Sequence, residues 1–220
     1  MLGPKLKPLR LALIGMSGSG KTFWANRLAE AGYPVTSCDS RIEDRLKHEL
    51  REGGHSGVAG VAAWMGSPDQ PAYPQRAAKY LAAEVAVMDE TLGTLERNPA
   101  RELVLDTTGS VVYTGEAIGV RLRSLMTVVY LEASPKEQAL LIERYMSHPK
   151  PVLWRNAYHP RPGENTHDTL MRCFPALIEG RRRQYELWSH CVLPMHTLRA
   201  PALDAAQFLA LIRRNCRCAT

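Results

Sequence analysis

Residues 11–22 read LALIGMSGSGKT, and this stretch decides the fold. Its apolar start, Leu11–Ile14, predicts a buried strand, and the residues from Lys21 onward show a helical pattern that stops at Gly32. Between them, residues 15–22 match GxxxxGK[ST] in full, in the strand–loop–helix context that this pattern requires. The stretch therefore predicts a loop that binds the phosphates of a nucleotide.

Each residue type in this loop suits that task. Glycine allows the backbone to wrap around a phosphate with its N–H groups pointing inward, and the following helix adds its positive end. Lys21 can reach the β- and γ-phosphates, and the Thr22 hydroxyl can bind Mg²⁺. We therefore expect ATP and Mg²⁺ as cofactors and Lys21 as an exposed catalytic residue. The predicted nucleotide-binding residues are Gly15, Ser17, Gly18, Ser19, Gly20, Lys21 and Thr22.

The composition is that of an ordinary soluble globular protein with one domain over residues 1–220. Hydrophobic residues make up 45% and charged residues 23% of the chain. These values exclude a disordered tail protein, a collagen-like fibre and a disulfide-rich miniprotein. The formal charge of +6 suits a protein that handles anionic phosphates or an anionic substrate, and equally a basic surface that arose by chance.

The sequence favours a cytoplasmic protein. No apolar run approaches the ~18 residues needed to cross a bilayer, so we expect no membrane contact. The apolar stretch near the N-terminus is too short for a signal peptide. Five cysteines without CxxC spacing indicate neither a disulfide framework nor a zinc site, which fits reduced thiols.

Short apolar runs alternate with helical patterns along the chain, which predicts a parallel α/β sheet. A capping box at Ser40–Glu43 and the pair Ser134-Pro135 each predict a helix start. Residues 53–75, rich in Gly, Ala, Pro and Ser, predict an irregular insertion, and residues 147–168, with four prolines, predict a mobile loop. The expected strands are Leu11–Ile14, Pro34–Cys38, Glu102–Asp106, Met126–Leu131 and Cys191–Met195. Further helices are expected over about 76–97, around 177–188 and over about 203–214.

Two carboxylates are predicted to lie near the phosphate loop. Asp106 closes the strand sequence ELVLD, and ligands of open α/β sheets bind at such carboxyl ends, so Asp106 can hold Mg²⁺ or merely cap the turn. Asp39 is expected to end the second strand and to face the same crevice. Because Ser40 already supplies a helix cap, we favour Asp39 as the contact and possible base for a substrate hydroxyl.

With these elements in place, the chain resembles shikimate kinase, a small P-loop kinase, over about Leu11 to Met195. The resemblance implies a P-loop NTPase fold, a three-layer α/β/α sandwich with a central parallel sheet of about five strands and a mobile lid at about 147–168. The matching segments are the phosphate loop, Ser37–Glu43, LDTTGS at 105–110, Tyr130–Glu132, Lys150–Leu153 and Arg181–Tyr185.

The resemblance also implies roles for single residues. Lys21, Asp39 and Lys150 fall on catalytic positions, and Asp39, Gly109 and Arg181 on positions that bind the phosphate acceptor. Thr22 falls on a metal position, to which Asp106 is added above. Lys150 stands where the family has a lid arginine, and a second register places His148-Pro149 there.

The chain departs from the family pattern in three further ways. Ser37 stands where the family has a magnesium-binding aspartate. Thr107 and Thr108 replace two of its three glycines. The family's Phe-Arg has no clear partner here, and Arg76 lies only near that position.

Several arginines are further candidates. Arg181 shares a helix face with Leu177 and Tyr185, which predicts that it points inward, and an inward arginine in this place favours an acceptor with a carboxylate. Arg155 and Arg161 lie in the proline-rich loop, where a closing lid can bring either to the transferring phosphate.

The leading hypothesis is an ATP-dependent kinase that phosphorylates a hydroxyl of a small anionic metabolite, as a cytoplasmic monomer. The alternative is a non-catalytic nucleotide-binding regulator that lost the kinase substrate site, which Ser37 and the altered glycine turn favour. A nucleic-acid-associated NTPase is the third hypothesis, supported by the basic charge alone, and we expect no nucleic-acid partner.

Overall fold

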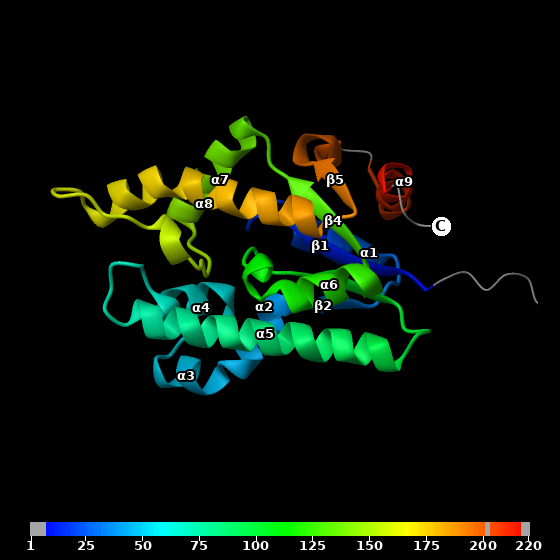
Figure 1. Ribbon diagram of the computed structural model, residues 1–220, viewed down its shortest axis with the longest axis horizontal. Helices are drawn as coiled ribbons and strands as arrows, with labels where there is room; N and C mark the ends of the chain where they lie inside the picture. Colours follow the sequence, from blue (N-terminus) through cyan, green and yellow to red (C-terminus); the bar gives the residue numbers. More distant parts are fainter. Residues whose placement is uncertain (1–7, 201–202, 217–220) are drawn as a thin grey trace, which may run out of the picture.

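The protein is described by a computed structural model that covers residues 8–200 and 203–216, in which a central sheet lies between helices (Figure 1). Within these residues the sheet has five strands, all parallel, in the order β2-β3-β1-β4-β5. The predicted parallel α/β sheet is thus confirmed. The strands are β1 (Arg10–Ile14), β2 (Val35–Ser37), β3 (Leu103–Asp106), β4 (Thr127–Glu132) and β5 (Cys191–Pro194).

Helices connect these strands, and none of those in the described residues is long and apolar enough to span a membrane. The α-helices are α1 (Lys21–Glu30), α2 (Cys38–Arg45), α3 (Lys47–Glu52), α4 (Gly57–Met65), α5 (Tyr73–Arg97), α6 (Glu116–Leu125), α7 (Pro135–Ser147), α8 (Thr166–Trp188) and α9 (Ala205–Asn215). The described part of the chain also contains three 3₁₀ turns: η1 (Val111–Tyr113), η2 (Arg155–Ala157) and η3 (Met195–Arg199).

The two faces of the sheet are covered by different helices. Successive strand residues point to opposite faces, so Leu11 and Leu13 join one apolar core with α1 and α9. Ala12 and Ile14 join the other core with α5, α6 and α8. The result is the expected three-layer α/β/α sandwich, and because the sheet is covered on both sides the middle residues of β1 and β3 are apolar on both faces.

The second helix begins earlier than the sequence predicts. Ser37, not Ser40, caps α2, because the Ser37 hydroxyl accepts a hydrogen bond from the backbone N–H of Ser40. Strand β2 accordingly ends at Ser37, where it pairs with Asp106 of β3. Both serines are good caps, and only the pairing of β2 with β3 determines which of them ends the strand.

The expectation of an irregular segment at 53–75 is wrong for residues 73–75, which begin α5, and for residues 57–65, which form α4. Two glycines lower the intrinsic helix propensity there. Val61, Trp64 and Met65 nevertheless pack into the core beside α2 and α5, and burial of that face outweighs propensity. Glu43 also accepts a hydrogen bond from the first backbone N–H of α4, at Gly57.

A buried carboxylate of α5 stabilises the turn after β3 through hydrogen bonds. Glu84 is 1% exposed, and it accepts hydrogen bonds from the hydroxyls of Thr108 and Ser110. Burial raises the pKa of Glu84 to about 7, although both hydroxyls oppose the shift. A buried Glu within a helical pattern carries no sequence signal for this role, because its partners lie 24 and 26 residues away.

We define the lid as residues 148–165, between α7 and α8. The loop is anchored to the rest of the molecule near its middle. Val152, Leu153 and Trp154 are buried, and the Tyr73 hydroxyl at the start of α5 donates to the Val152 carbonyl and accepts from the Trp154 N–H.

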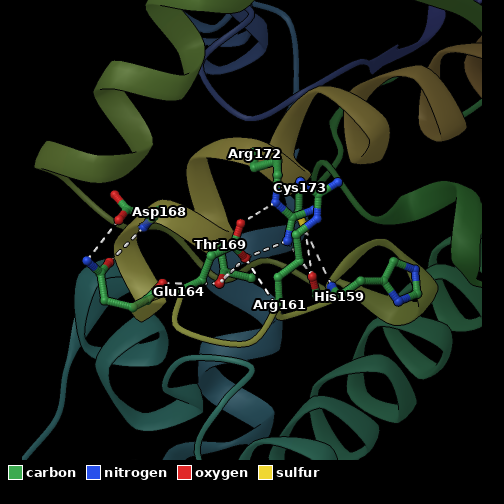
Figure 2. Close-up of polar contacts among 8 residues, drawn as sticks. His159, Arg161, Glu164, Asp168, Thr169, Arg172 and Cys173 are labelled. Carbon is green, nitrogen blue, oxygen red and sulfur yellow. Dashed lines mark hydrogen bonds and ion pairs between the residues drawn. The ribbon is translucent and has the colours of Figure 1, made fainter.

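The second half of the lid is tied to α8 by Glu164, at the centre of the contacts in Figure 2. Glu164 pairs with Arg172 through both carboxylate oxygens, and it accepts from the Thr169 hydroxyl and the Arg161 N–H. Arg172 also donates to the His159 carbonyl. Residues 159–164 are therefore folded against α8.

We predict that Arg172→Met loosens this half of the lid. Loss of the ion pair frees Glu164, so a glutamyl endopeptidase is expected to cleave after Glu164 several-fold faster, with little change in the melting temperature. Arg183→Met, which removes an exposed ion pair with Glu179 on the same helix, is the matched control. An unchanged cleavage rate in Arg172→Met would show that the pair does not hold the lid.

Glu84 predicts a pH dependence of stability. The pKa of Glu84 is higher in the folded protein than the ordinary value of 4.5, so the folded state binds the proton more tightly. This stabilisation is present at low pH and is lost as the pH rises from about 4.5 to about 7, by an amount on the order of 3 kcal/mol. Glu84→Gln is expected to reduce that loss.

The measurement is the free energy of unfolding in urea at pH 5 and pH 8 for wild type, Glu84→Gln and the exposed control Glu143→Gln. If wild type and Glu84→Gln lose the same stability between the two pH values, the carboxyl does not titrate as described.

Candidate functional site

The phosphate loop connects β1 to α1 and has the backbone that the glycine pattern predicts. Gly15 has a φ of 139°, and a Cβ there would lie 2.7 Å from the Leu131 carbonyl, so no larger residue fits. Gly20, which precedes α1, has a φ of 98°. The loop is therefore shaped by glycine backbone next to β4, at the N-terminal end of α1.

Lys21 is not exposed, contrary to the sequence expectation. It is 6% exposed, and its Nζ donates to the carbonyls of Gly15 at 2.8 Å and Met16 at 2.9 Å. Burial lowers the pKa of Lys21 to about 8, while the carboxylates of Asp106 and Asp39 oppose the shift. The ammonium is thus held inside the loop that it is expected to serve.

Asp106 ends β3 beside β1, so it lies next to the phosphate loop as expected. It is 3% exposed, and its Oδ1 has no hydrogen-bond partner among the described residues. Burial raises the pKa of Asp106, and Lys21 and the neighbouring Thr22 hydroxyl oppose this. Mg²⁺ binds through one or two protein oxygens while phosphates and water supply the rest, so Asp106 and Thr22 fit such an ion.

The phosphate loop opens into a cleft that contains most of the predicted site. Asp39 enters it from the first turn of α2, and not from the end of a strand, because α2 begins at Cys38. Burial raises the pKa of Asp39, and the charge of Lys21 opposes this. The cleft is lined by Ser17, Gly18, Gly20, Lys21, Thr22, Phe23, Asp39, Val58, Tyr80, Thr107, Thr108, Gly109, Lys150 and Pro151.

The lid contributes Lys150 and Pro151 to this cleft, which corresponds to the first of the two lid registers. Neither arginine suggested as a lid cation lines it within the described residues. The guanidinium of Arg155 lies 5.2 Å from the centre of the Tyr113 ring, and Arg161 belongs to the contacts around Glu164 (Figure 2).

Arg181 points inward, as predicted, but it is not among the residues that line the cleft. It is 1% exposed, and its guanidinium donates to the carbonyls of Gly109 at 2.8 Å and Leu153 at 2.9 Å. It also lies 5.1 Å from the centre of the Tyr113 ring. Arg181 therefore joins the turn after β3 to the lid, whereas Gly109 itself reaches the cleft.

Sequence reasoning did not identify Val58 and Tyr80, which also line the cleft. Val58 lies on α4, in the segment expected to be irregular, and Tyr80 lies on the long helix α5 with the residue pattern of a core position. Only the packing of α4 and α5 beside α2 brings them to the cleft.

A second cavity also borders the phosphate loop. It shares Gly18, Gly20 and Phe23 with the first, and it includes Arg144 of α7 and Arg199 of η3. These cationic residues had no signal in the sequence, because they are brought together from distant segments. The full lining is Gly18, Ser19, Gly20, Phe23, Trp24, Arg27, Arg144, Met195, Leu198, Arg199, Ala200 and Leu203.

Comparison with protein-family models and with curated proteins gives no match. Among solved structures, the chain is similar to shikimate kinase from Acinetobacter baumannii in complex with shikimate, with 23% identity, a TM-score of 0.55 and coverage of 93% of this chain and 90% of that one. It is also similar to shikimate kinase from Bacteroides thetaiotaomicron, with 18% identity, a TM-score of 0.56 and coverage of 94% and 95%.

A third similar structure is shikimate kinase from Aquifex aeolicus, with 15% identity, a TM-score of 0.55 and coverage of 94% of this chain and 97% of that one. At these identities the likeness concerns the fold. The resemblance seen in the sequence motifs is therefore confirmed in three dimensions over nearly the whole chain, which has the fold of the shikimate kinases.

Proposed function

We propose that the protein is an ATP-dependent kinase that transfers a phosphoryl group to a hydroxyl of a small molecule. The observation that supports this is the convergence in one cleft of Lys21, Thr22 and Asp39, next to the free carboxylate oxygen of Asp106. Lys21 and Thr22 follow β1, Asp39 follows β2, and Asp106 is the last residue of β3. A monomer that works in the cytoplasm belongs to the same proposal.

The two cavities suggest where the substrates lie. The phosphates would bind the loop at Gly15–Gly20, and the nucleoside would extend into the second cavity, between the lid-side Arg144 and the apolar Leu198. The acceptor would then occupy the first cleft against Asp39 and Tyr80. The phosphate loop borders both, so the transferring phosphate would lie between them.

The proposed mechanism relies on positioning and charge. Lys21 and Lys150 would neutralise negative charge on the transferring phosphate, and backbone N–H groups of the loop would hold its oxygens. Asp39 would orient the acceptor hydroxyl and take its proton. Thr22 and Asp106 would hold Mg²⁺, which when bound offsets phosphate charge.

A non-catalytic nucleotide-binding regulator is the second candidate. It is favoured by Ser37, whose hydroxyl caps α2 at a position where the resemblance implies a metal-binding aspartate. ATP consumption by purified protein with a panel of sugars, hydroxy acids and nucleosides, shikimate included, separates the two. Stimulation by any acceptor supports the kinase, and ATP binding without stimulation supports the regulator.

We predict that Lys21→Met lowers ATP turnover more than about 100-fold, because it removes the cation from the phosphates. The methionine stem can fill the space of the buried lysine stem, so the protein is expected to stay folded, as checked by its melting temperature. Lys47→Met, an exposed lysine of α3, is the control. A folded Lys21→Met protein with normal turnover would contradict the proposed function.

Asp106 and Ser37 are predicted to respond differently to substitution. Asp106→Asn removes the free charged oxygen, so the Mg²⁺ concentration for half-maximal activity is expected to rise about tenfold or more. Ser37→Ala removes a helix cap, so it is expected to lower stability by about 1 kcal/mol and to leave the Mg²⁺ requirement unchanged. A larger rise in Mg²⁺ requirement for Ser37→Ala would contradict the metal assignment.

A further inference from the structure

The charges that line the first cleft restrict the kind of acceptor it can take. Among the residues that the structure describes, Lys21 and Lys150 are the cations of the lining, and Asp39 is its carboxylate. Asp106 lies beside them and interacts with the same two lysines. The cleft therefore holds two positive and two negative side chains before any substrate binds.

Neither nearby arginine adds to the cations of the cleft. Arg181 is 1% exposed, and its guanidinium is engaged by the carbonyls of Gly109 and Leu153 and by the Tyr113 hydroxyl. To bind a carboxylate it would have to leave the buried Leu153 carbonyl without this partner, which is costly, whereas the Gly109 carbonyl would keep the hydrogen bond from the Tyr185 hydroxyl. Arg76 donates to the Trp64 carbonyl and lies over the Trp64 ring.

A bound nucleotide changes the balance toward negative charge. A magnesium nucleoside triphosphate carries a net negative charge, and the two lysines would face its phosphates. A carboxylate on the acceptor would then enter a cleft with Asp39, Asp106 and phosphate oxygens, without a cation of its own. Like charges repel strongly in a partly buried site, because the effective dielectric constant there is lower than in water.

The other groups that line the first cleft suit an acceptor with hydroxyl groups and apolar carbon–hydrogen surface. In residues 8–200 and 203–216, the Asp39 carboxylate makes no side-chain hydrogen bond, so it is free to accept from hydroxyl groups. Val58, Tyr80 and Pro151 offer apolar surface next to it. Apolar surface with a few polar groups that fix orientation is the usual form of a small-molecule site.

We propose that the phosphate acceptor is an uncharged polyol, such as a sugar or a sugar alcohol, and not a carboxylate. This inference rests on the proposed kinase function. It departs from the sequence hypothesis of an anionic acceptor, for which Arg181 was the main argument from a single residue. In this assignment Arg181 is a positioning residue that joins Gly109 to the lid.

The test compares matched pairs of acceptors that differ in one charged group. Glucitol is paired with gluconate and ribitol with ribonate, and shikimate is added as a further acid. The measured quantity is kcat/KM for each acceptor at saturating MgATP. We expect the uncharged member of at least one pair to be used at least about tenfold better than its acid.

The outcomes separate this inference from the function on which it rests. If the acids are used better than their uncharged partners, the inference is overturned and the kinase function stands. If neither kind of acceptor is phosphorylated while ATP binds, the kinase function is overturned, and the inference with it.

Substitution at Val58 tests the charge argument directly. Val58 is half-buried and lines the first cleft, so Val58→Arg adds a cation to it. Val58→Gln is the uncharged control. Relative to Val58→Gln, Val58→Arg is expected to raise the use of acids over uncharged acceptors about tenfold. An unchanged ratio would contradict the placement of the acceptor against α4.

Arg181→Lys provides a second readout. Because a lysine cannot hold both carbonyls, the melting temperature is expected to fall while the ratio of acid to uncharged acceptor stays the same. A selective loss of activity toward acids, with the melting temperature unchanged, would show that Arg181 binds a carboxylate and would overturn the inference.

Discussion

The parallel pairing of β1 with β3 on one side and β4 on the other is the constraint on which the site depends. Because parallel strands end at the same edge, the segments that follow β1, β2 and β3 meet there. These segments are the phosphate loop, the first turn of α2 and the turn at 107–110. A single edge therefore brings together the lysine, the hydroxyl and the carboxylates of the proposed site.

Several charged groups at this edge are buried, and their neighbours explain how the fold tolerates them. Lys21 is compensated by two loop carbonyls, and Arg181 by the carbonyls of Gly109 and Leu153. The buried Glu84 carboxylate accepts hydrogen bonds from two hydroxyls of the turn after β3. Among these charged groups, Asp106 keeps a buried oxygen without a partner in the described residues, and its proposed role as a metal ligand rests on this.

The hydrogen bonds of Arg181 also connect the lid to the turn that lines the first cleft. Arg181 contacts both the turn after β3 and the lid, and Tyr73 holds the lid from α5. If a bound substrate shifted Gly109, the Arg181 guanidinium would move with it and displace Leu153, which is close to Lys150 in the lid. With the second half of the lid tied to α8 through Glu164, the residues near Lys150 are where movement of the lid would matter to the cleft.

The sequence by itself determined the parts of this protein that rest on local chemistry. The pattern of residues 15–22 was sufficient for the phosphate loop, apolar runs were sufficient for β1, β3 and β4, and Ser134-Pro135 was sufficient for the start of α7. Family motifs were sufficient for the fold, because they cover the loops that follow its strands. In each case the signal lies within a few neighbouring residues.

Only the tertiary structure decided what depends on distant partners. The start of α2 depended on β3, the helical state of α4 depended on the core beside α5, and the burial of Lys21 depended on how its loop folds back. Arg181 shows the reason most clearly, since its helix face predicted that it points inward but not which groups it meets. Its partners Gly109 and Leu153 lie 72 and 28 residues away in the chain, and no local pattern carries that information.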